Sequence, residues 1–172
     1  MVVSATGSIN TPVEGLRDLL ANLSAFQVWL GVDEDDAVAA KALVYLYEQE
    51  ITINATTGAP AASVPRWALV HWPEDLGSLS ATGYRGELYL QFHEEVHEDN
   101  EGDFADEYHA FMNSISTIMD AALALAQTAG YLYFLEVRPV APIRNVRGEE
   151  STQEPHWDLA FTVPVGLQPA ST

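Results

Sequence analysis

The chain has no cysteine and only one lysine among its 172 residues. Without cysteine it can form no disulfide bond, thiolate zinc site or iron–sulfur cluster, and it has no thiol nucleophile. Cations are scarce in general: 7 lysines and arginines stand against 25 aspartates and glutamates, giving a formal net charge of −18. Because binding to a nucleic-acid backbone needs clustered cations, this composition argues against a nucleic-acid-binding protein.

Long apolar runs are also missing. The first residues lack the basic and apolar segments of a signal peptide, and no apolar stretch approaches the roughly 20 residues that span a bilayer. We therefore expect a soluble protein made in the cytoplasm. A hydrophobic content of 48% can supply one core in a chain of this length. We expect a flexible arm at 1–10, a single domain at 11–166 and a flexible tail at 167–172.

The N-terminal part carries helix signals. Thr11 can cap a helix in which Glu14 completes a capping box, and leucines then recur at helical spacing. Ser24 can cap a second short helix that Gly31 ends. The acidic turn at 33–36 favours the start of a third short helix. The sequence thus predicts a short N-terminal helical region.

A strand pattern follows. β-Branched and aromatic residues predict strands at 43–47, 51–53 and 66–72, with a Gly- and Pro-containing loop at 54–65. Residues 84–93 alternate strictly between apolar and polar positions. This alternation predicts a strand with one buried face and one face in water.

The most regular helix signal comes next. Apolar residues from Phe104 to Leu125 recur every three or four positions, and Gly130 ends the pattern. Two more strands are predicted, at 131–137 and 157–165. Because helices and strands do not alternate regularly, we expect an α+β fold. It would contain a mostly antiparallel sheet of about five strands, with one long helix packed on a face.

His93 to His97 form a literal H-E-x-x-H motif. On a helix, two such histidines bind zinc and the glutamate activates water. Here the motif directly continues the alternating strand, where residues four apart lie about 13 Å from each other, too far for one zinc ion. We therefore expect a chance match and no metal site, although a weak metal contact stays open. A zinc hydrolase using His93, Glu94 and His97 is a distant alternative.

Two charge clusters could form a subunit or partner contact. Residues 94–107 hold eight carboxylates, which we interpret as a solvated acidic turn before the long helix rather than a cation site. Three of the seven cations lie within ten residues, between the last two predicted strands. Unless these are ordinary surface arginines, they could meet the acidic turn of a neighbouring copy. The candidate contact residues are Arg138, Arg144, Arg147, Glu94, Glu95, Glu98, Asp99 and Glu101.

No sequence pattern demands an enzyme. The chain contains neither a nucleophile elbow nor a glycine-rich phosphate loop. His71, His109 and His156 are isolated in the sequence, and we expect each to be a structural or surface residue. We therefore predict no catalytic residue and no cofactor.

The order of the predicted elements is itself informative. A leading helix contains four leucines, Leu16, Leu19, Leu20 and Leu23. The segment 25–31, a helix at 33–40 and strands at 43–47 and 66–72 follow. A long helix and a closing strand at 157–163 complete the order. In this plan and in a few aromatic positions, over about residues 11–166, the chain resembles the tail-terminator and tail-completion (neck) proteins of tailed viruses.

The resemblance implies a small α+β protomer that assembles into a ring, commonly a hexamer, between the tail tube and the head connector. It implies a structural virion protein without catalysis, assembled in the host cytoplasm, whose partners are the tail-tube and connector proteins. A ring contact needs two complementary surfaces, which the acidic turn and the arginine cluster could provide. DNA would pass through the ring without sequence-specific binding.

The strong acidity leaves three interpretations open. Abundant carboxylates with scarce lysine are typical of a protein from a high-salt cytoplasm, where ions screen self-repulsion. A negative ring lumen would also repel DNA and let it slide. Alternatively, the acidity is the function, as in an acidic DNA-mimic inhibitor of a nucleic-acid-binding host enzyme. Such mimicry would need a continuous acidic face.

Overall fold

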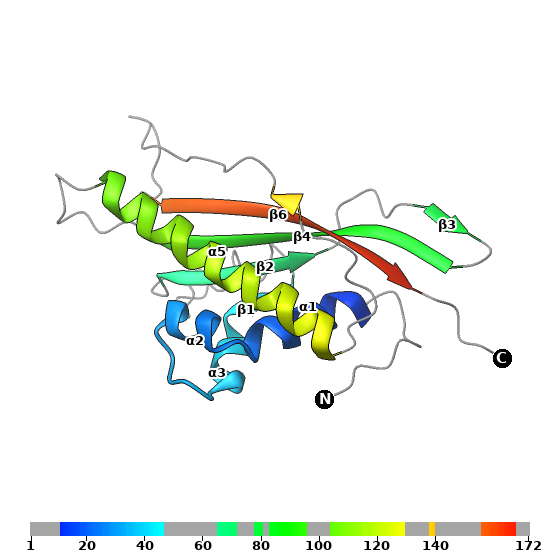
Figure 1. The fold of residues 1–172 in the computed structure, drawn as a ribbon, viewed down its shortest axis with the longest axis horizontal. Helices are drawn as coiled ribbons and strands as arrows, with labels where there is room; N and C mark the ends of the chain where they lie inside the picture. Colours follow the sequence, from blue (N-terminus) through cyan, green and yellow to red (C-terminus); the bar gives the residue numbers. More distant parts are fainter. Residues whose placement is uncertain are drawn as a thin grey trace, which may run out of the picture.

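The structure, a computed structural model, describes residues 11–46, 65–71, 78–80, 83–95, 104–129, 138–139 and 156–167 (Figure 1). The helices in these ranges are α1 (Thr11–Ala21), α2 (Ser24–Leu30), α3 (Ala37–Ala42) and α5 (Phe104–Ala129). The strands in these ranges are β1 (Val44–Tyr45), β2 (Arg66–His71), β3 (Ser78–Ser80), β4 (Gly83–Glu95), β5 (Arg138–Pro139) and β6 (His156–Leu167). No helix in the described part of the chain is both long and apolar enough to cross a bilayer.

The described strands form one mixed sheet in the order β1-β2-β4-β6-β5, with β3 also paired to β4. Strand β4 lies between β2 and β6 and is antiparallel to both. Strand β1 is parallel to β2. The α+β class is therefore confirmed, but the expected sheet of about five mostly antiparallel strands needs correction. The sheet is mixed, and among the described strands only β2, β4 and β6 exceed three residues.

The alternation predicted for β4 is confirmed. Leu88, Leu90 and Phe92 are completely buried on one face of the strand. Tyr89, Gln91, His93 and Glu95 are only partly buried on the other face. Because side chains of a strand point to opposite faces in turn, one apolar stripe in β4 is enough to define a core side.

The core lies between this side of the sheet and the helices α1, α2 and α5, which cover it (Figure 1). Phe92 is its aromatic centre. Its ring meets those of Phe26 from α2, Trp29 from α2 and Phe161 from β6 edge-on, with centroids 6.2, 5.6 and 5.9 Å away. Helix α5 adds Ile115 to the same cluster with no exposed surface. Each fully buried side chain of this kind contributes about 1.5–3 kcal/mol of hydrophobic stabilisation.

The short helices begin and end close to their predicted bounds. Gly31 ends α2 in the left-handed region at φ 75°, a conformation that favours glycine. Asp36 caps α3, because its carboxylate accepts a hydrogen bond from the amide of Ala39 at 2.9 Å. The predicted cap at Ser24 is wrong. Leu23 holds the N-cap position of α2 without a side-chain capping bond, and Ser24 is the first helical residue.

A buried amide fixes the turn between α2 and α3. Gln27 is 3% exposed, and its Nε2 donates to the carbonyl of Ala21 at 2.8 Å. Its Oε1 accepts from the backbone amide of Asp35 at 3.0 Å. Asp35 has φ 74°, a left-handed conformation that aspartate tolerates better than most residues. The Gln27 side chain therefore links the end of α1 to the turn that precedes α3.

Several predictions fall outside the described residues. These are the strands at 51–53 and 131–137, most of the loop at 54–65, and the proposed arm at 1–10. The limits of the domain accordingly stay predictions. Within its described residues, 43–46, the strand predicted at 43–47 is observed as β1, and the short strands β3 and β5 were not predicted. Strands this short carry no periodicity of their own and exist through their pairing with β2, β4 and β6.

Phe92→Ala should destabilise the protein by about 3–5 kcal/mol, because it opens a cavity between three aromatic rings. Val38→Ala is the control, since Val38 is 83% exposed and should change stability by less than about 0.5 kcal/mol. Chemical denaturation followed by tryptophan fluorescence measures both effects. Equal losses in the two variants would contradict the assignment of Phe92 to the centre of the core.

Candidate functional site

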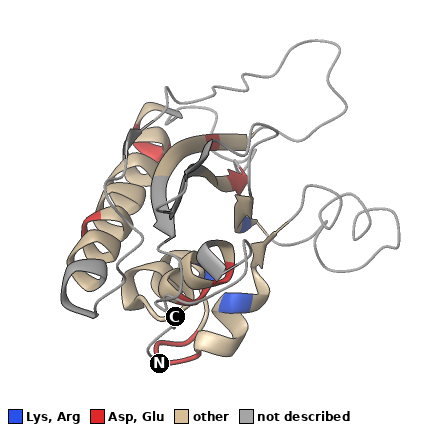
Figure 2. Cartoon of the chain, turned by 90° about the vertical axis from the view of Figure 1, so that its right-hand side faces the viewer, with Lys and Arg blue, Asp and Glu red and all other residues tan. Residues whose placement is uncertain are grey.

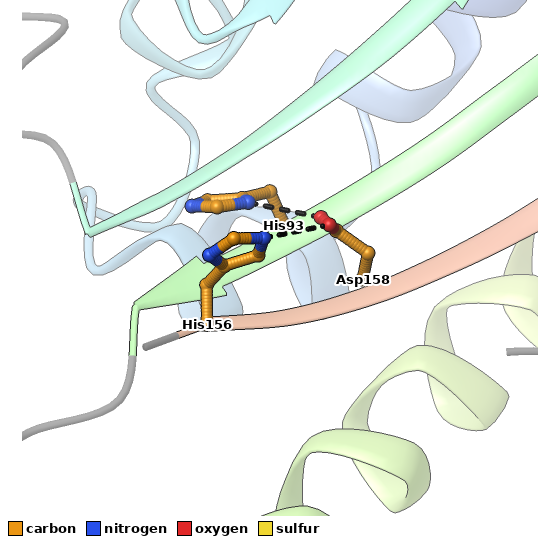
Figure 3. A group of neighbouring side chains, drawn as sticks. All are labelled: His93, His156 and Asp158. Atoms are coloured by element: carbon orange, nitrogen blue, oxygen red, sulfur yellow. Dashed lines mark hydrogen bonds and ion pairs between the residues drawn. The ribbon is translucent and has the colours of Figure 1, made fainter. Parts of the chain in front are cut away.

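The face of the sheet opposite α1, α2 and α5 carries a cluster of two histidines and one aspartate (Figure 3). His93 of β4 and Asp158 of β6 are register partners, directly opposite each other in the antiparallel pair. His156 precedes Asp158 by two residues on β6, so both side chains point to the same face. The cluster therefore follows from strand pairing together with the two-residue period of a strand.

The two imidazole rings converge on one carboxylate. His93 Nδ1 lies 2.9 Å from Asp158 Oδ1, and His156 Nε2 lies 3.1 Å from Asp158 Oδ2. Each carboxylate oxygen thus contacts a different ring. The ring centroids of His93 and His156 are 4.7 Å apart, and their planes differ by 35°. Figure 3 shows the rings side by side, with one nitrogen of each directed at Asp158.

Neighbouring side chains restrict how the cluster can move. Trp67, the register partner of His93 on β2, stacks on its ring with centroids 4.4 Å apart and an interplanar angle of 11°. Gln91 forms a side-chain hydrogen bond with Asp158. The side chains of His93, His156 and Asp158 are only 13%, 11% and 8% exposed. The cluster is therefore largely buried and held from two sides.

Asp158 is stabilised as an anion. Burial by itself raises the pKa of this carboxyl, because desolvation penalises the charged form. Hydrogen bonds with His93 and Gln91 and electrostatic attraction to His93 and His156 act in the opposite direction and outweigh burial. The net result is a pKa below the ordinary value for aspartate. At neutral pH the cluster thus contains a carboxylate next to two imidazoles.

This arrangement has two chemical capabilities. The carboxylate can hold two imidazoles in fixed orientations through charge-assisted hydrogen bonds. Alternatively, three potential ligand atoms, one from each residue, all lie within 4.8 Å of one another and could surround a metal ion. Imidazole nitrogen and carboxylate oxygen are both common ligands of divalent transition metals.

The H-E-x-x-H motif does not form its zinc-binding arrangement in the described residues. His93, Glu94 and Glu95 lie in β4, which confirms that the motif continues the strand. Consecutive strand residues face opposite ways, so Glu94 lies on the helix side, away from His93. The remaining residues of the motif, Val96 and His97, lie outside the described part.

Glu94 is instead part of an ion pair at the edge of the core. Its Oε1 accepts from Arg66 Nη2 at 2.8 Å, and its Oε2 accepts from the indole Nε1 of Trp29 at 2.8 Å. Arg66 also donates to the backbone carbonyl of Trp29 at 2.8 Å. These bonds join α2 to the adjacent strands β2 and β4. Both carboxylate oxygens of Glu94, a predicted subunit-contact residue, therefore already have hydrogen-bond partners within the same chain.

The other predicted contact residues are only partly placed. Glu95 is half-buried on the same strand. Arg138 lies in β5, opposite Thr162 of β6 in the strand register. Glu98, Asp99, Glu101, Arg144 and Arg147 lie outside the described residues. Their assignment to a subunit contact stays a prediction.

The sequence reasoning missed two members of the cluster. It treated His156 as isolated and did not single out Asp158. The signal was present as His-x-Asp at 156–158, because this spacing on a strand places both side chains on one face. It did not reveal His93 as the third member, since the register of β4 against β6 joins residues 65 positions apart.

No protein-family model matches the chain, and no curated protein is significantly similar to it. The chain's function is therefore inferred from its own residues, from their arrangement in space and from the order of its elements.

Asp158→Asn should lower the free energy of unfolding by about 1–3 kcal/mol, because a neutral amide cannot accept hydrogen bonds from both histidines and one buried donor loses its partner. Asp120→Asn, an exposed substitution of the same kind on α5, is the control and should change it by less than about 0.5 kcal/mol. Urea denaturation at pH 7 with EDTA present measures the difference. Identical midpoints for the two variants would show that the cluster adds nothing to stability.

The same variant pair should show a defined pH dependence. The pKa of Asp158 is lower in the folded chain than its ordinary value of 3.8, so the unfolded chain binds this proton more readily. The stabilisation from Asp158 is then complete above pH 3.8 and is lost as pH falls through the folded-state pKa. The stability difference between the native chain and Asp158→Asn should therefore shrink as pH falls below 3.8. A difference that grows as pH falls below 3.8 would contradict the direction of the shift.

Proposed function

We propose that the chain is a structural subunit of the neck of a tailed virus, a tail-terminator or tail-completion protein that forms a ring between the tail tube and the head connector. The order of the described elements supports this proposal. Three short helices precede β1 and β2, the long helix α5 stands between β4 and β6, and β6 is the last described element. This is the order on which the resemblance to neck proteins rests.

The distribution of charge is compatible with such a ring. The cations whose side chains the structure describes all have acidic neighbours in the same chain: Arg17 with Glu14, Lys41 with Asp18, and Arg66 with Glu94. They are therefore already occupied within the protomer. A charge-complementary contact between copies would instead use the arginines at 138, 144 and 147, facing the acidic turn of the next copy.

The adaptor role accounts for the described surface better than nucleic-acid mimicry. A mimic presents a continuous acidic face, whereas the acidic positions among the described residues are spread over the helices and the sheet strands (Figure 2). The proposed ring needs no catalytic residue and no cofactor. A negative lumen would let DNA pass without holding it, because like charges repel.

Light scattering or native mass spectrometry of the purified chain should reveal a discrete oligomer, with six copies as the expected number. Copies that each carry a formal charge of −18 repel one another, so the oligomer should be more populated at high salt than at low salt. A chain that stays monomeric at both salt concentrations, does not bind a tail-tube protein and captures a nucleic-acid-processing enzyme would favour the mimic instead.

Replacing both Arg144 and Arg147 with Gln should reduce the oligomer without unfolding the protomer. The matched control is Asn113→Glu with Ser116→Glu, two exposed positions on α5 that lower the net charge by the same two units. Circular dichroism checks the fold of each variant, and light scattering measures its mass. An equal loss of mass in both double variants would point to general charge repulsion rather than to an arginine contact.

A further inference from the structure

We propose that His93, His156 and Asp158 form a binding site for one divalent transition-metal ion, with zinc as the best match. The site goes beyond the proposed neck function and does not depend on it. It is also distinct from the H-E-x-x-H motif, with which it shares only His93. The three potential ligand atoms lie within 4.8 Å of one another. Glu94 and His97, which the motif would use together with His93, are not part of this cluster.

The chemistry of the donors selects the class of metal. Two imidazole nitrogens and one carboxylate oxygen suit zinc and its first-row neighbours. Calcium and magnesium prefer sites made of oxygen atoms alone, so two histidines disfavour them. Three protein ligands leave the fourth position of a tetrahedral zinc ion to water or to another ligand.

The spacing of the donors decides how far they must move to hold zinc. Zinc bonds of about 2.0–2.1 Å in a tetrahedral site place neighbouring ligand atoms roughly 3.3 Å apart. His93 Nδ1 lies 2.9 Å from Asp158 Oδ1, and His156 Nε2 lies 3.1 Å from Asp158 Oδ2. One ligand atom from each of the three residues lies within 4.8 Å of the other two. Side-chain rotations that shorten the widest of these separations toward roughly 3.3 Å would place the donors around an ion.

The surroundings favour such a site. The ligands stand on paired strands, and the elements that carry them are rigid in comparison with loops. Stacking of Trp67 fixes the plane of His93, and Gln91 orients the carboxylate of Asp158. Supporting contacts of this kind orient metal ligands in known sites. The low exposure of the three side chains also limits the access of water that would compete with them for the ion.

The cluster holds together without a metal through its own hydrogen bonds, so the full chain can be tested both with and without an ion. After removal of metal with EDTA and dialysis, the chain is titrated with zinc against a chromophoric chelator. We expect one zinc ion per chain. Cobalt in place of zinc should give the strong visible absorption of a tetrahedral site with nitrogen ligands, which a solvated carboxylate site does not produce.

Two variants locate the ion. His156→Gln should weaken zinc binding by more than the roughly 10–100-fold that loss of a supporting contact causes. His109→Gln removes an exposed histidine of α5 and should bind zinc as the native chain does. Zinc should raise the melting temperature of the native chain and of His109→Gln, but not of His156→Gln. If circular dichroism shows that His156→Gln does not fold, His93→Gln takes its place in the same comparison.

Three results would overturn the proposal. The first is the absence of stoichiometric zinc binding by the native chain. The second is unchanged affinity in His156→Gln or His93→Gln, which would place the ion elsewhere, for example in the acidic run at 94–107. The third is a cobalt complex with the weak absorption of octahedral oxygen coordination. None of these results depends on whether the chain forms a ring.

Discussion

Strand β4 lies between β2 and β6, so each of its side chains must face either the helices or the opposite side of the sheet. The core depends on one set of alternate residues, because Phe92 and its two preceding leucines meet α1, α2 and α5. The histidine–aspartate cluster depends on the other set, which includes His93. A shift of one residue in the register of β4 would exchange the two sets. Burial of the apolar set therefore fixes the position of His93 as well.

The two faces of β4 also differ in electrostatics. On the helix side, Glu94 is bound by Arg66 and by the indole of Trp29, so its charge is neutralised by a cation. On the opposite side, Asp158 has two imidazoles and an amide as neighbours. A carboxylate with these neighbours stays ionised at neutral pH and can accept a positive ion between itself and the rings. The sequence contains many carboxylates, but the structure places only this one between two histidines among the described residues.

The proposed neck function and the proposed metal site place different demands on the chain. A ring subunit needs a rigid protomer with complementary edges, and its strong negative charge must be screened or paired when copies meet. A metal ion across β4 and β6 would join the two longest strands near one end of their pairing. It would make the protomer more rigid without creating the fold. The two roles are therefore compatible, and either can exist without the other.

The sequence by itself determined the local elements. Leucine spacing defined α1, the left-handed glycine at 31 ended α2, the apolar repeat defined α5, and strict alternation assigned the two faces of β4. Each of these signals comes from residues within a few positions of one another. The same alternation correctly argued that the H-E-x-x-H motif continues a strand as far as Glu95.

Only the tertiary structure decided which strands pair, that β1 runs parallel to β2, and that His93 meets Asp158. Strand order and register depend on the total burial of all elements together, and no local pattern encodes them. His156 and Asp158 share a face because of their spacing, but their third neighbour comes from a strand more than 60 residues earlier. For the same reason the cluster could not be recognised in the sequence, whereas the core that positions it could.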